Sequence, residues 1–373
     1  MQYDNLSKIE LINMCKKHKI KGYTGKNKSN LILLLENKHD VDVYNDNDND
    51  NDNDNDKLKI ADLFCGTGAF SLGLEQTGKF ITIFANDLLP SSKIIYDLNF
   101  KHKLICEDIH NINVKNISKC DILTGGFPCQ PFSIAGLRKG FADERSNVFW
   151  KIMEIIQHHK PRFVILENVK NLLTHDNKNT FTTIKNALEE NGYHVIYNIL
   201  DTSIITNIPQ HRERIYIVCF KNNDDYKKFI DAGGLNFPKV KTLNIMDMLE
   251  HNVPNKYYYT STSYPKVWEL IKDSIKNINV VYQYRRVYVR ENKSNLCPTL
   301  TANMGSGGHN VPLILDKNGI RKLTPRECFN FQGFPNTFKL PPHLADCHLY
   351  KLAGNAISLP VIKLIANRIT NIL

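Results

Sequence analysis

The sequence predicts an α/β fold built on a doubly wound, mostly parallel sheet, with a smaller irregular domain and a small helical module at the N-terminus. Apolar runs such as KIADLF, FITIFAND, CDILTGG and RFVILEN recur from Leu58 onward, and helical patterns such as NVFWKIMEIIQHHK separate several of them. Alternation of strands with helices is typical of parallel sheets. The length of 373 residues is enough for one large domain and one or two smaller ones.

The charge balance favours an anionic partner. Lysine and arginine number 48 against 38 aspartates and glutamates, a formal net charge of +10. Nucleic acid is the leading candidate, because no amphipathic basic stretch indicates a membrane surface. No apolar run is long enough to span a bilayer and the polar N-terminus is no signal peptide, so we expect an intracellular protein. The nine cysteines are scattered, which predicts neither a disulfide framework nor a metal site.

Residues 1–38 are predicted to form a compact helical module. Ser7 and Glu10 have the spacing of a capping box at the start of a first helix, and LILLLE continues a second helix that begins near Lys26. Lysines gather around the join between the two helices. This pattern resembles the SAP module, a helix-extended-helix unit that binds DNA. The alternative is a solvated lysine-rich face without a binding role.

A low-complexity segment, YNDNDNDNDNDND, follows this module. It has no apolar residue to bury, which predicts a disordered tether. We therefore expect five parts: the module over 1–38, an Asn/Asp linker over 39–56, a sheet domain over 57–220, an irregular domain over 221–325, and a segment over 326–373 that returns to the sheet domain.

A cofactor site is predicted where the first strand ends. DLFCGTGAF places Gly66 and Gly68 in a tight turn between a strand and a helix. The next two strands end in Asp87 and Asp108, where carboxylates can accept the hydroxyls of a ribose. No G-K-[ST] phosphate cradle is present, so the pattern favours an adenosine ligand without phosphates. S-adenosylmethionine fits best.

The stretch GGFPCQPFSIAG raises the question of a reactive cysteine. Cys129 follows a short apolar run closed by two glycines, and so is expected near the carboxyl end of a strand, where ligands bind in open α/β sheets. Taken alone, a single cysteine is more often packing material than a nucleophile.

The order of the sequence blocks resolves this question. From Lys57 to Leu373 the chain carries DLFCGTGAFSLGLE, FAND, EDI, GGFPCQPFSIAG, ENV, QHRER, TLTANMGSGG, RKLTPRECFNFQGFP and GNA. In this order the blocks resemble the DNA (cytosine-5)-methyltransferase family of prokaryotic and viral modification enzymes. The resemblance implies a Rossmann-like catalytic domain over 57–220, a target-recognition domain over 221–325, and double-stranded DNA clamped between them.

The resemblance also implies a monomeric, sequence-specific enzyme that acts on DNA in a prokaryotic cytoplasm or in the replication compartment of a viral host. A restriction endonuclease of the same specificity is a partner that it allows. Matched by position, the residues implied for the cofactor pocket are Phe64, Gly66, Thr67, Gly68, Asp87, Asp108, Ile109, Pro128, Asn355 and Ala356.

The chemistry of this family requires three reacting groups. Carbon 5 of cytosine is a poor nucleophile until a thiolate adds to carbon 6, and Cys129 is matched to that role. Glu167 would reach N3 and the exocyclic amine, and Arg214 would hold O2. Because carbon 6 is stacked inside the duplex, the base must be flipped out.

Residues expected to contact DNA lie in the loop after the cysteine, in QHRER and in the irregular domain. The segment from about residue 222 to 310 is expected to set the recognition sequence through the major groove. The candidates are Gln130, Ser133, Arg212, Arg285, Arg286, Arg290, Thr299 and Thr301.

Two other functions compete with this interpretation. One is methylation of cytosine in transfer RNA, whose enzymes typically carry PPCQ and a CFT signature, whereas this chain has FPCQ and no CFT. The other is an inactive DNA-binding regulator, which would lack the cysteine, the glutamate or the arginine. All three are present.

Overall fold

The computed structural model describes residues 6–17, 28, 31, 35, 56–128, 148–285, 287–292, 294–306 and 310–373. The predicted linker, up to residue 55, lies outside the described residues. So do Cys129 and the loop that follows it.

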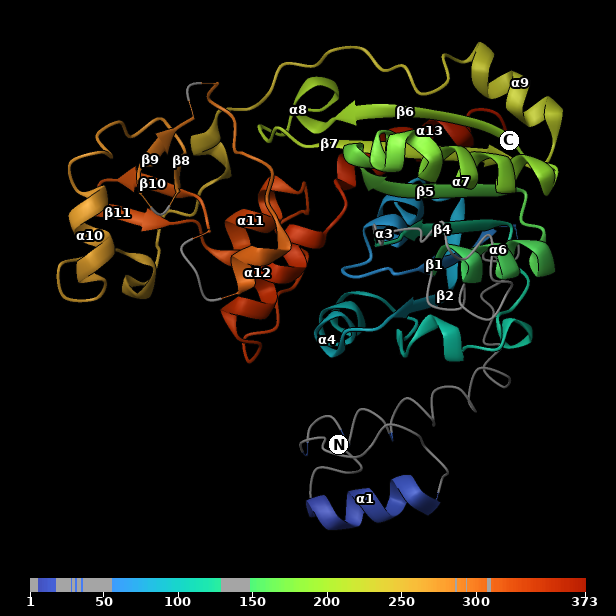
Figure 1. Cartoon of the computed structure of the whole chain (residues 1–373), viewed down its shortest axis with the longest axis horizontal. Helices are drawn as coiled ribbons and strands as arrows, with labels where there is room; N and C mark the ends of the chain where they lie inside the picture. Colours follow the sequence, from blue (N-terminus) through green and yellow to red (C-terminus); the bar gives the residue numbers. More distant parts are fainter. Residues whose placement is uncertain are drawn as a thin grey trace.

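Within the described residues, seven strands form a sheet in the order β3-β2-β1-β4-β5-β7-β6 (Figure 1). The strands from β1 to β5 pair in parallel, whereas β7 runs antiparallel to both β5 and β6. This mixed but mostly parallel sheet confirms the predicted fold class. Their bounds are β1 (Leu58–Leu63), β2 (Phe80–Asp87), β3 (Ile105–Cys106), β4 (Ile122–Gly126), β5 (Phe163–Val169), β6 (His194–Asp201) and β7 (Glu213–Phe220).

Hydrophobic cores cover both faces of this sheet, because neighbouring strand residues point to opposite sides. Ile60 belongs to one core and Ala61 to the other. The first core includes side chains from α3 (Ala69–Glu75), α4 (Pro90–Asn99) and α13 (Leu359–Thr370). The second includes side chains from α6 (Val148–His159) and α7 (Asn179–Glu190). The sheet is therefore doubly wound.

Strand order places β2 and β4 on opposite sides of β1, so the order of the strands reverses direction at β1. In an open α/β sheet, the crevice at such a switch point is where ligands bind. Short turns at this edge and elsewhere are η1 (Ile109–Asn111), η2 (Val114–Asn116), η4 (Lys170–Leu173), η5 (His175–Lys178), α8 (Thr202–Ile205), η6 (Ile245–Met248), η7 (Asn255–Tyr257) and η8 (Ala302–Gly305).

The first helix after β7 packs on the large sheet rather than on the irregular region. In α9 (Asn223–Asp231), the ring of Phe229 lies 4.9 Å from that of Phe220 between centroids. Asp225 accepts from Nε of Arg162 at 2.8 Å. Part of the region 221–325 therefore belongs to the sheet side of the molecule.

A smaller lobe contains a four-stranded antiparallel sheet in the order β11-β10-β8-β9 and the helix α10 (Pro265–Ile271). It has its own core, which includes Tyr259, Ile271, Tyr282 and Leu313. Figure 1 shows α11 (Pro325–Phe331) and α12 (Asp346–Asn355) between this lobe and the large sheet. The strands are β8 (Tyr282–Tyr284), β9 (Val289–Glu291), β10 (Leu313–Asp316) and β11 (Gly319–Lys322).

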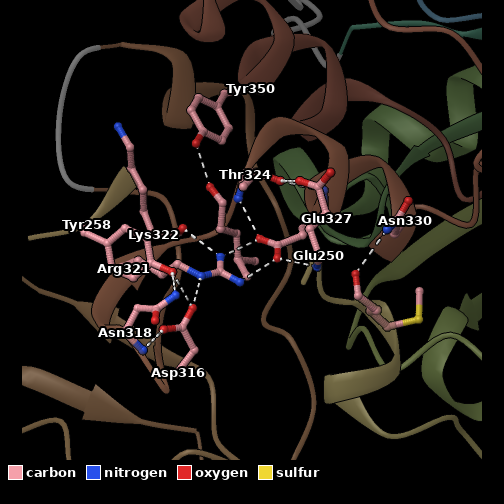
Figure 2. A network of polar contacts seen from close by, with 12 residues as sticks. Glu250, Tyr258, Asp316, Asn318, Arg321, Lys322, Thr324, Glu327, Asn330 and Tyr350 are labelled. Carbon is pink, nitrogen blue, oxygen red and sulfur yellow. Dashed lines mark hydrogen bonds and ion pairs between the residues drawn. The ribbon is translucent and has the colours of Figure 1, made fainter. Parts of the chain in front are cut away.

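A buried ion-pair network joins the small lobe to α11 (Figure 2). Arg321 of β11 is 1% exposed and donates from Nη2 to Oε1 of Glu327 at 2.7 Å and from Nε to Oδ2 of Asp316 at 2.6 Å. Glu327 also completes a capping box with Thr324 at the start of α11. Since a bidentate guanidinium–carboxylate pair has a defined geometry, this network fixes the β10–β11 hairpin against α11.

The apolar residues of the C-terminal helices are mostly buried inside the protein. Asp346–Thr370 is apolar and long enough to be considered for a membrane span, but 72% of its most apolar window is buried. The segment consists of α12 and α13, separated at residues 356–358. Side chains of α13 such as Ile362 pack against Gly73 of α3, so the last helix lies against the sheet domain.

The described part of the N-terminal module contains α1 (Lys8–Lys17). Ser7 N donates to Oε2 of Glu10 at 2.6 Å, and Glu10 N donates to Oγ of Ser7 at 3.3 Å, which confirms the predicted capping box. A small core contains Leu11 and Cys15 of α1 together with Leu31 and Leu35, which come later in the module. The likeness to a SAP module stays a prediction.

Candidate active site

A cavity of about 600 Å³ opens at the carboxyl ends of β1, β2, β4 and β5. It unites residues predicted for the cofactor with residues predicted for catalysis. The predicted residues that line it are Phe64, Gly66, Thr67, Asp87, Asp108, Ile109, Pro128, Glu167, Arg212, Arg214, Asn355 and Ala356.

The turn after β1 has an unusual backbone. Phe64 has a φ of 52° and Gly66 a φ of 54°, both in the left-handed region. An aromatic residue rarely adopts this conformation, and such strain is typical of functional sites. A Cβ added at Gly66 would meet no protein atom closer than 3.9 Å, so it would occupy the cavity. The hydroxyl of Thr67 is buried without a partner in the described residues.

A buried aspartate holds this turn in place. Asp62 of β1 accepts from Oγ of Ser71 in α3 at 2.7 Å and from Oγ1 of Thr124 in β4 at 2.8 Å. Burial raises the pKa of Asp62 to about 6, although these hydrogen bonds oppose the shift. The carboxyl group therefore links β1, β4 and α3 beneath the cavity floor.

Two carboxylates line the adjoining wall. Asp87 accepts from the backbone N–H of Gly66 at 2.9 Å and from that of Leu89 at 2.8 Å, one on each oxygen. Burial raises the pKa of Asp87, while its hydrogen bonds lower it. Asp108 accepts from the N–H of His110 at 3.0 Å. Each carboxylate oxygen has a second lone pair, so both groups can still accept ligand hydroxyls.

Gly68, predicted as a cofactor contact, does not line the cavity. It precedes α3 with a φ of 76°, and its α-carbon faces the rings of Phe100 and Tyr96. Its role is to let the turn pass close to these rings.

The substitution Gly68→Ala should lower the free energy of unfolding by about 2 kcal/mol or more, because it combines left-handed strain with overpacking. The new Cβ would lie 2.5 Å from the ring of Phe100. Urea unfolding measures the loss. Gly78→Ala is the matched control, since Gly78 has a φ of 77° and no atom within 4 Å of the new Cβ. Equal losses at the two sites would contradict the packing role.

Glu167 and Arg214 form an ion pair in the wall of the cavity. Oε1 of Glu167, at the end of β5, lies 3.2 Å from Nε of Arg214 on β7. Burial raises the pKa of Glu167, and the charges of Arg214 and Arg212 act against that shift. The carboxyl group can therefore hold a proton more readily than an exposed glutamate can.

Arg212 has a different position from the one predicted. It is 2% exposed, and it donates from Nη1 to the carbonyl of Leu300 at 2.9 Å and from Nη2 to that of Ala356 at 2.8 Å. Burial lowers the pKa of Arg212 to about 9, which leaves it cationic at neutral pH. Because its Nη donors are directed at these carbonyls, Arg212 supports the wall of the site. The prediction that it contacts DNA is therefore corrected to a supporting role.

Cys129 lies outside the described residues, but the strand end that precedes it is well fixed. Nδ2 of Asn168 donates to the carbonyl of Phe127 at 2.9 Å, and Pro128 lines the cavity. Cys65 also lines the cavity, but burial raises the pKa of its thiol well above the ordinary value. A buried thiol of this kind is a poor nucleophile.

Another wall of the first cavity comes from α12, which packs directly on the loop around Thr301 that is predicted to contact DNA. A Cβ at Gly354 would lie 2.2 Å from the carbonyl of Thr301. Thr301 itself contacts Asn303 through its hydroxyl. The residues Asn355 and Ala356, which line the cavity, are thus next to the TLTANMG segment.

A second cavity, of about 670 Å³, adjoins the small lobe. Arg285, Arg290 and Thr299, all predicted as DNA contacts, line it together with His211. Gln130, Ser133 and Arg286 lie outside the described residues.

Sequence reasoning missed several residues of the first cavity: Leu88, Leu89, Ser92, Glu107, His110 and Lys351. Leu88 is 62% exposed, which is unusual for leucine directly after a strand. Its place after the acidic residue that ends β2 is the signal that could have identified it. Among the described residues, no group of three or more His, Cys, Asp or Glu side chains could hold a metal ion.

Comparison with known proteins gives one consistent result. Residues 58–371 match the sequence model of a family described as C-5 cytosine-specific DNA methylase. The chain is 52% identical to Type II methyltransferase M.Bsp6I of Bacillus sp. (strain RFL6), in a match that covers 84% of this chain and 98% of that protein. It is 36% identical to M.HaeII of Haemophilus aegyptius, with 84% and 93% covered.

Solved structures agree in fold. The Entamoeba histolytica methyltransferase EhMeth matches with a TM-score of 0.64 and 20% identity over 84% of this chain and 98% of that one. The S. pombe Dnmt2 methyltransferase gives the same TM-score and identity, over 84% and 99%. At this identity the likeness concerns the fold alone.

Proposed function

This chain belongs to the C-5 cytosine-specific DNA methylase family, and on that premise we propose that it methylates one cytosine of a recognition sequence through a covalent bond from Cys129. It is a DNA cytosine-5 methyltransferase that uses S-adenosylmethionine. The observation that carries the proposal is one cavity that unites the glycine turn, the strand-end acids, Glu167 and Arg214.

The residues of the cavity suit S-adenosylmethionine. We assign Asp87 to the ribose hydroxyls, Asp108 and Ile109 to the adenine edge, and Phe64 to the adenine face. Two further features support the same ligand. The unpartnered hydroxyl of Thr67 can hydrogen-bond to it, and the space beside Gly66 leaves room for it. The cofactor supplies an electrophilic methyl group.

Cys129 is proposed to add as a thiolate to carbon 6 of cytosine. The addition converts the ring into an enamine whose carbon 5 is electron-rich. Phe127 is held by Asn168, and Pro128 lines the cavity, so the chain reaches the site one residue before the nucleophile.

Glu167 is proposed to protonate N3 as the thiolate adds. Its raised pKa supports this role, since a neutral carboxylic acid can donate. It would also accept from the exocyclic amine, which thymine lacks. Arg214 would donate to O2 and hold the carboxyl group of Glu167 toward the ring.

We propose that duplex DNA binds between the sheet domain and the small lobe, with the target base flipped into the first cavity. The region 221–325 would read the flanking bases, apart from α9, which packs on the large sheet. Arg285 and Arg290 support DNA binding by this region, because both are exposed, cationic side chains lining the second cavity.

The N-terminal module is proposed to raise DNA affinity without reading sequence. Deleting residues 1–56 should preserve the recognition site and the turnover rate but weaken DNA binding and reduce its salt dependence, because phosphate contacts are lost. Equilibrium binding across a salt series measures this. Identical binding curves for the full and shortened chains would contradict a DNA role for the module.

A direct assay separates this function from methylation of transfer RNA and from an inactive regulator. We expect tritium from labelled S-adenosylmethionine to enter duplex DNA and not transfer RNA. Bisulfite sequencing of the product would then give the recognition sequence. Label in transfer RNA, or no transfer at all, would contradict the proposal.

We also propose a monomer that acts in a prokaryotic cytoplasm alongside a restriction endonuclease of the same specificity. The support is that the relatives with 52% and 36% identity are called Type II methyltransferases.

A further inference from the structure

The second cavity contains a histidine that neither the family match nor the sequence patterns assign to a role. His211 lies in QHRER, two residues before β7 begins at Glu213, and its side chain is 53% exposed. The cavity of about 670 Å³ is lined by His211, Arg285, Arg290, Thr299 and neighbouring polar side chains. We propose that His211 binds a phosphate of the DNA backbone in this cavity, an inference that rests on the proposed function.

The imidazole ring is held in one orientation. Nδ1 of His211 lies 2.6 Å from Oδ2 of Asp201, the last residue of β6. Asp201 is 9% exposed, and its other oxygen accepts from the N–H and the hydroxyl of Ser203, each at 2.9 Å. Because the carboxylate is itself fixed, the ring cannot rotate freely, and its Nε2 edge has a defined direction.

The Nε2 edge remains available to a ligand. Oε2 of Glu213 lies 3.9 Å from Nε2, which is an ion-pair distance for a protonated ring but too long for a hydrogen bond, so Nε2 can still donate to a ligand. With Nδ1–H donated to Asp201, the ring can donate from Nε2 only as the imidazolium. His211 would therefore meet an acceptor as a cation, which suits a phosphate oxygen.

The main chain around His211 is tied to the segment that leads out of the small lobe. His211 N donates to the carbonyl of Cys297 at 2.9 Å, and Cys297 N donates to that of Pro209 at 2.7 Å. Oγ1 of Thr299 donates to the carbonyl of His211 at 2.7 Å. These bonds fix the distance between the QHRER loop and the cavity wall.

The opposite wall is cationic because of strand register. Tyr282 and Tyr284 of β8 pack into or against the core of the small lobe, so the alternate residue Gln283 and, two positions later, Arg285 face the other way. Gln283 pairs directly with Arg290 of β9, which places the two side chains on one face. That face lines the cavity, where Glu291 is the one acid among the lining residues that the structure describes.

A phosphate is a more suitable ligand for this cavity than a base edge. Three side chains able to carry positive charge meet in it, His211 from the sheet domain and Arg285 and Arg290 from the small lobe. Base-reading side chains, by contrast, need to project into the groove. A phosphate clamp at the junction of the lobes would set the register of the DNA without selecting its sequence.

The test compares His211→Gln, His211→Arg and the control His251→Gln, an exposed histidine outside both cavities. Binding to the target duplex and to an unrelated duplex is measured over a salt series. His211→Gln should weaken both complexes by about tenfold and reduce the slope of log K against log salt by about 0.9, one phosphate contact. His211→Arg should restore the slope, and His251→Gln should match the wild type.

Methyl transfer by the wild-type protein is measured first, so that failure of the proposed function is recognised separately. Given an active wild type, an unchanged slope in His211→Gln would overturn the inference. Loss of discrimination between the two duplexes with an unchanged slope would also overturn it, because that result indicates contact with a base.

Discussion

Replacing Cys129 with serine should lower the rate of methyl transfer by at least about a thousandfold, because a serine hydroxyl is a far weaker nucleophile than a thiolate. Binding of S-adenosylmethionine should persist, since the cavity walls from Phe64 to Asp108 do not depend on the thiol. The measurement is single-turnover transfer of labelled methyl groups to the recognition duplex.

Cys347→Ser is the matched control for this substitution. Cys347 is exposed and lies outside both cavities, so its variant should keep wild-type activity. Turnover by Cys129→Ser within tenfold of the wild type would mean that another group attacks carbon 6.

The substitution Glu167→Gln should lower the turnover rate by about a hundredfold to ten-thousandfold. Glutamine has the same shape and can hydrogen-bond to N3 and to the exocyclic amine, but it cannot transfer a proton. The Michaelis constant for DNA should therefore change little while turnover falls.

The pH profile gives an independent check of Glu167. Burial raises the pKa of this carboxyl group, and a group that donates as the neutral acid is active below its pKa. Wild-type turnover should therefore decline on the alkaline side, and the residual turnover of Glu167→Gln should lack that decline. A variant with nearly full activity and an unchanged profile would exclude Glu167 as the proton donor.

Much of the site follows from sequence because strand ends and glycine turns have clear local signals. Gly66 of DLFCGTG and the acids Asp87 and Asp108 are predicted at the carboxyl edge of a parallel sheet, and all three line one cavity in the structure, whereas Gly68 does not. Glu167 and Arg214 are 47 positions apart (214 − 167), yet strand pairing of β5 with β7 sets them side by side.

Other features depend on tertiary packing and left no local signal. Arg212 is predicted as a DNA contact, and arginines usually lie at the surface, but in the structure its guanidinium donates to the buried carbonyls of Leu300 and Ala356. The helix α9 packs on the large sheet because Phe229 contacts Phe220, and the composition of the segment does not predict this contact. The left-handed Phe64 runs against the usual preference of aromatic residues.

Covalent capture tests the central claim most directly. A recognition duplex with 5-fluorocytosine at the target position should form a stable adduct with the wild-type protein, because fluorine at carbon 5 blocks the final proton loss. Digestion and mass spectrometry should then find the methylated nucleotide on the peptide that contains Cys129. No adduct, or an adduct on Cys65 or another residue, would contradict the mechanism.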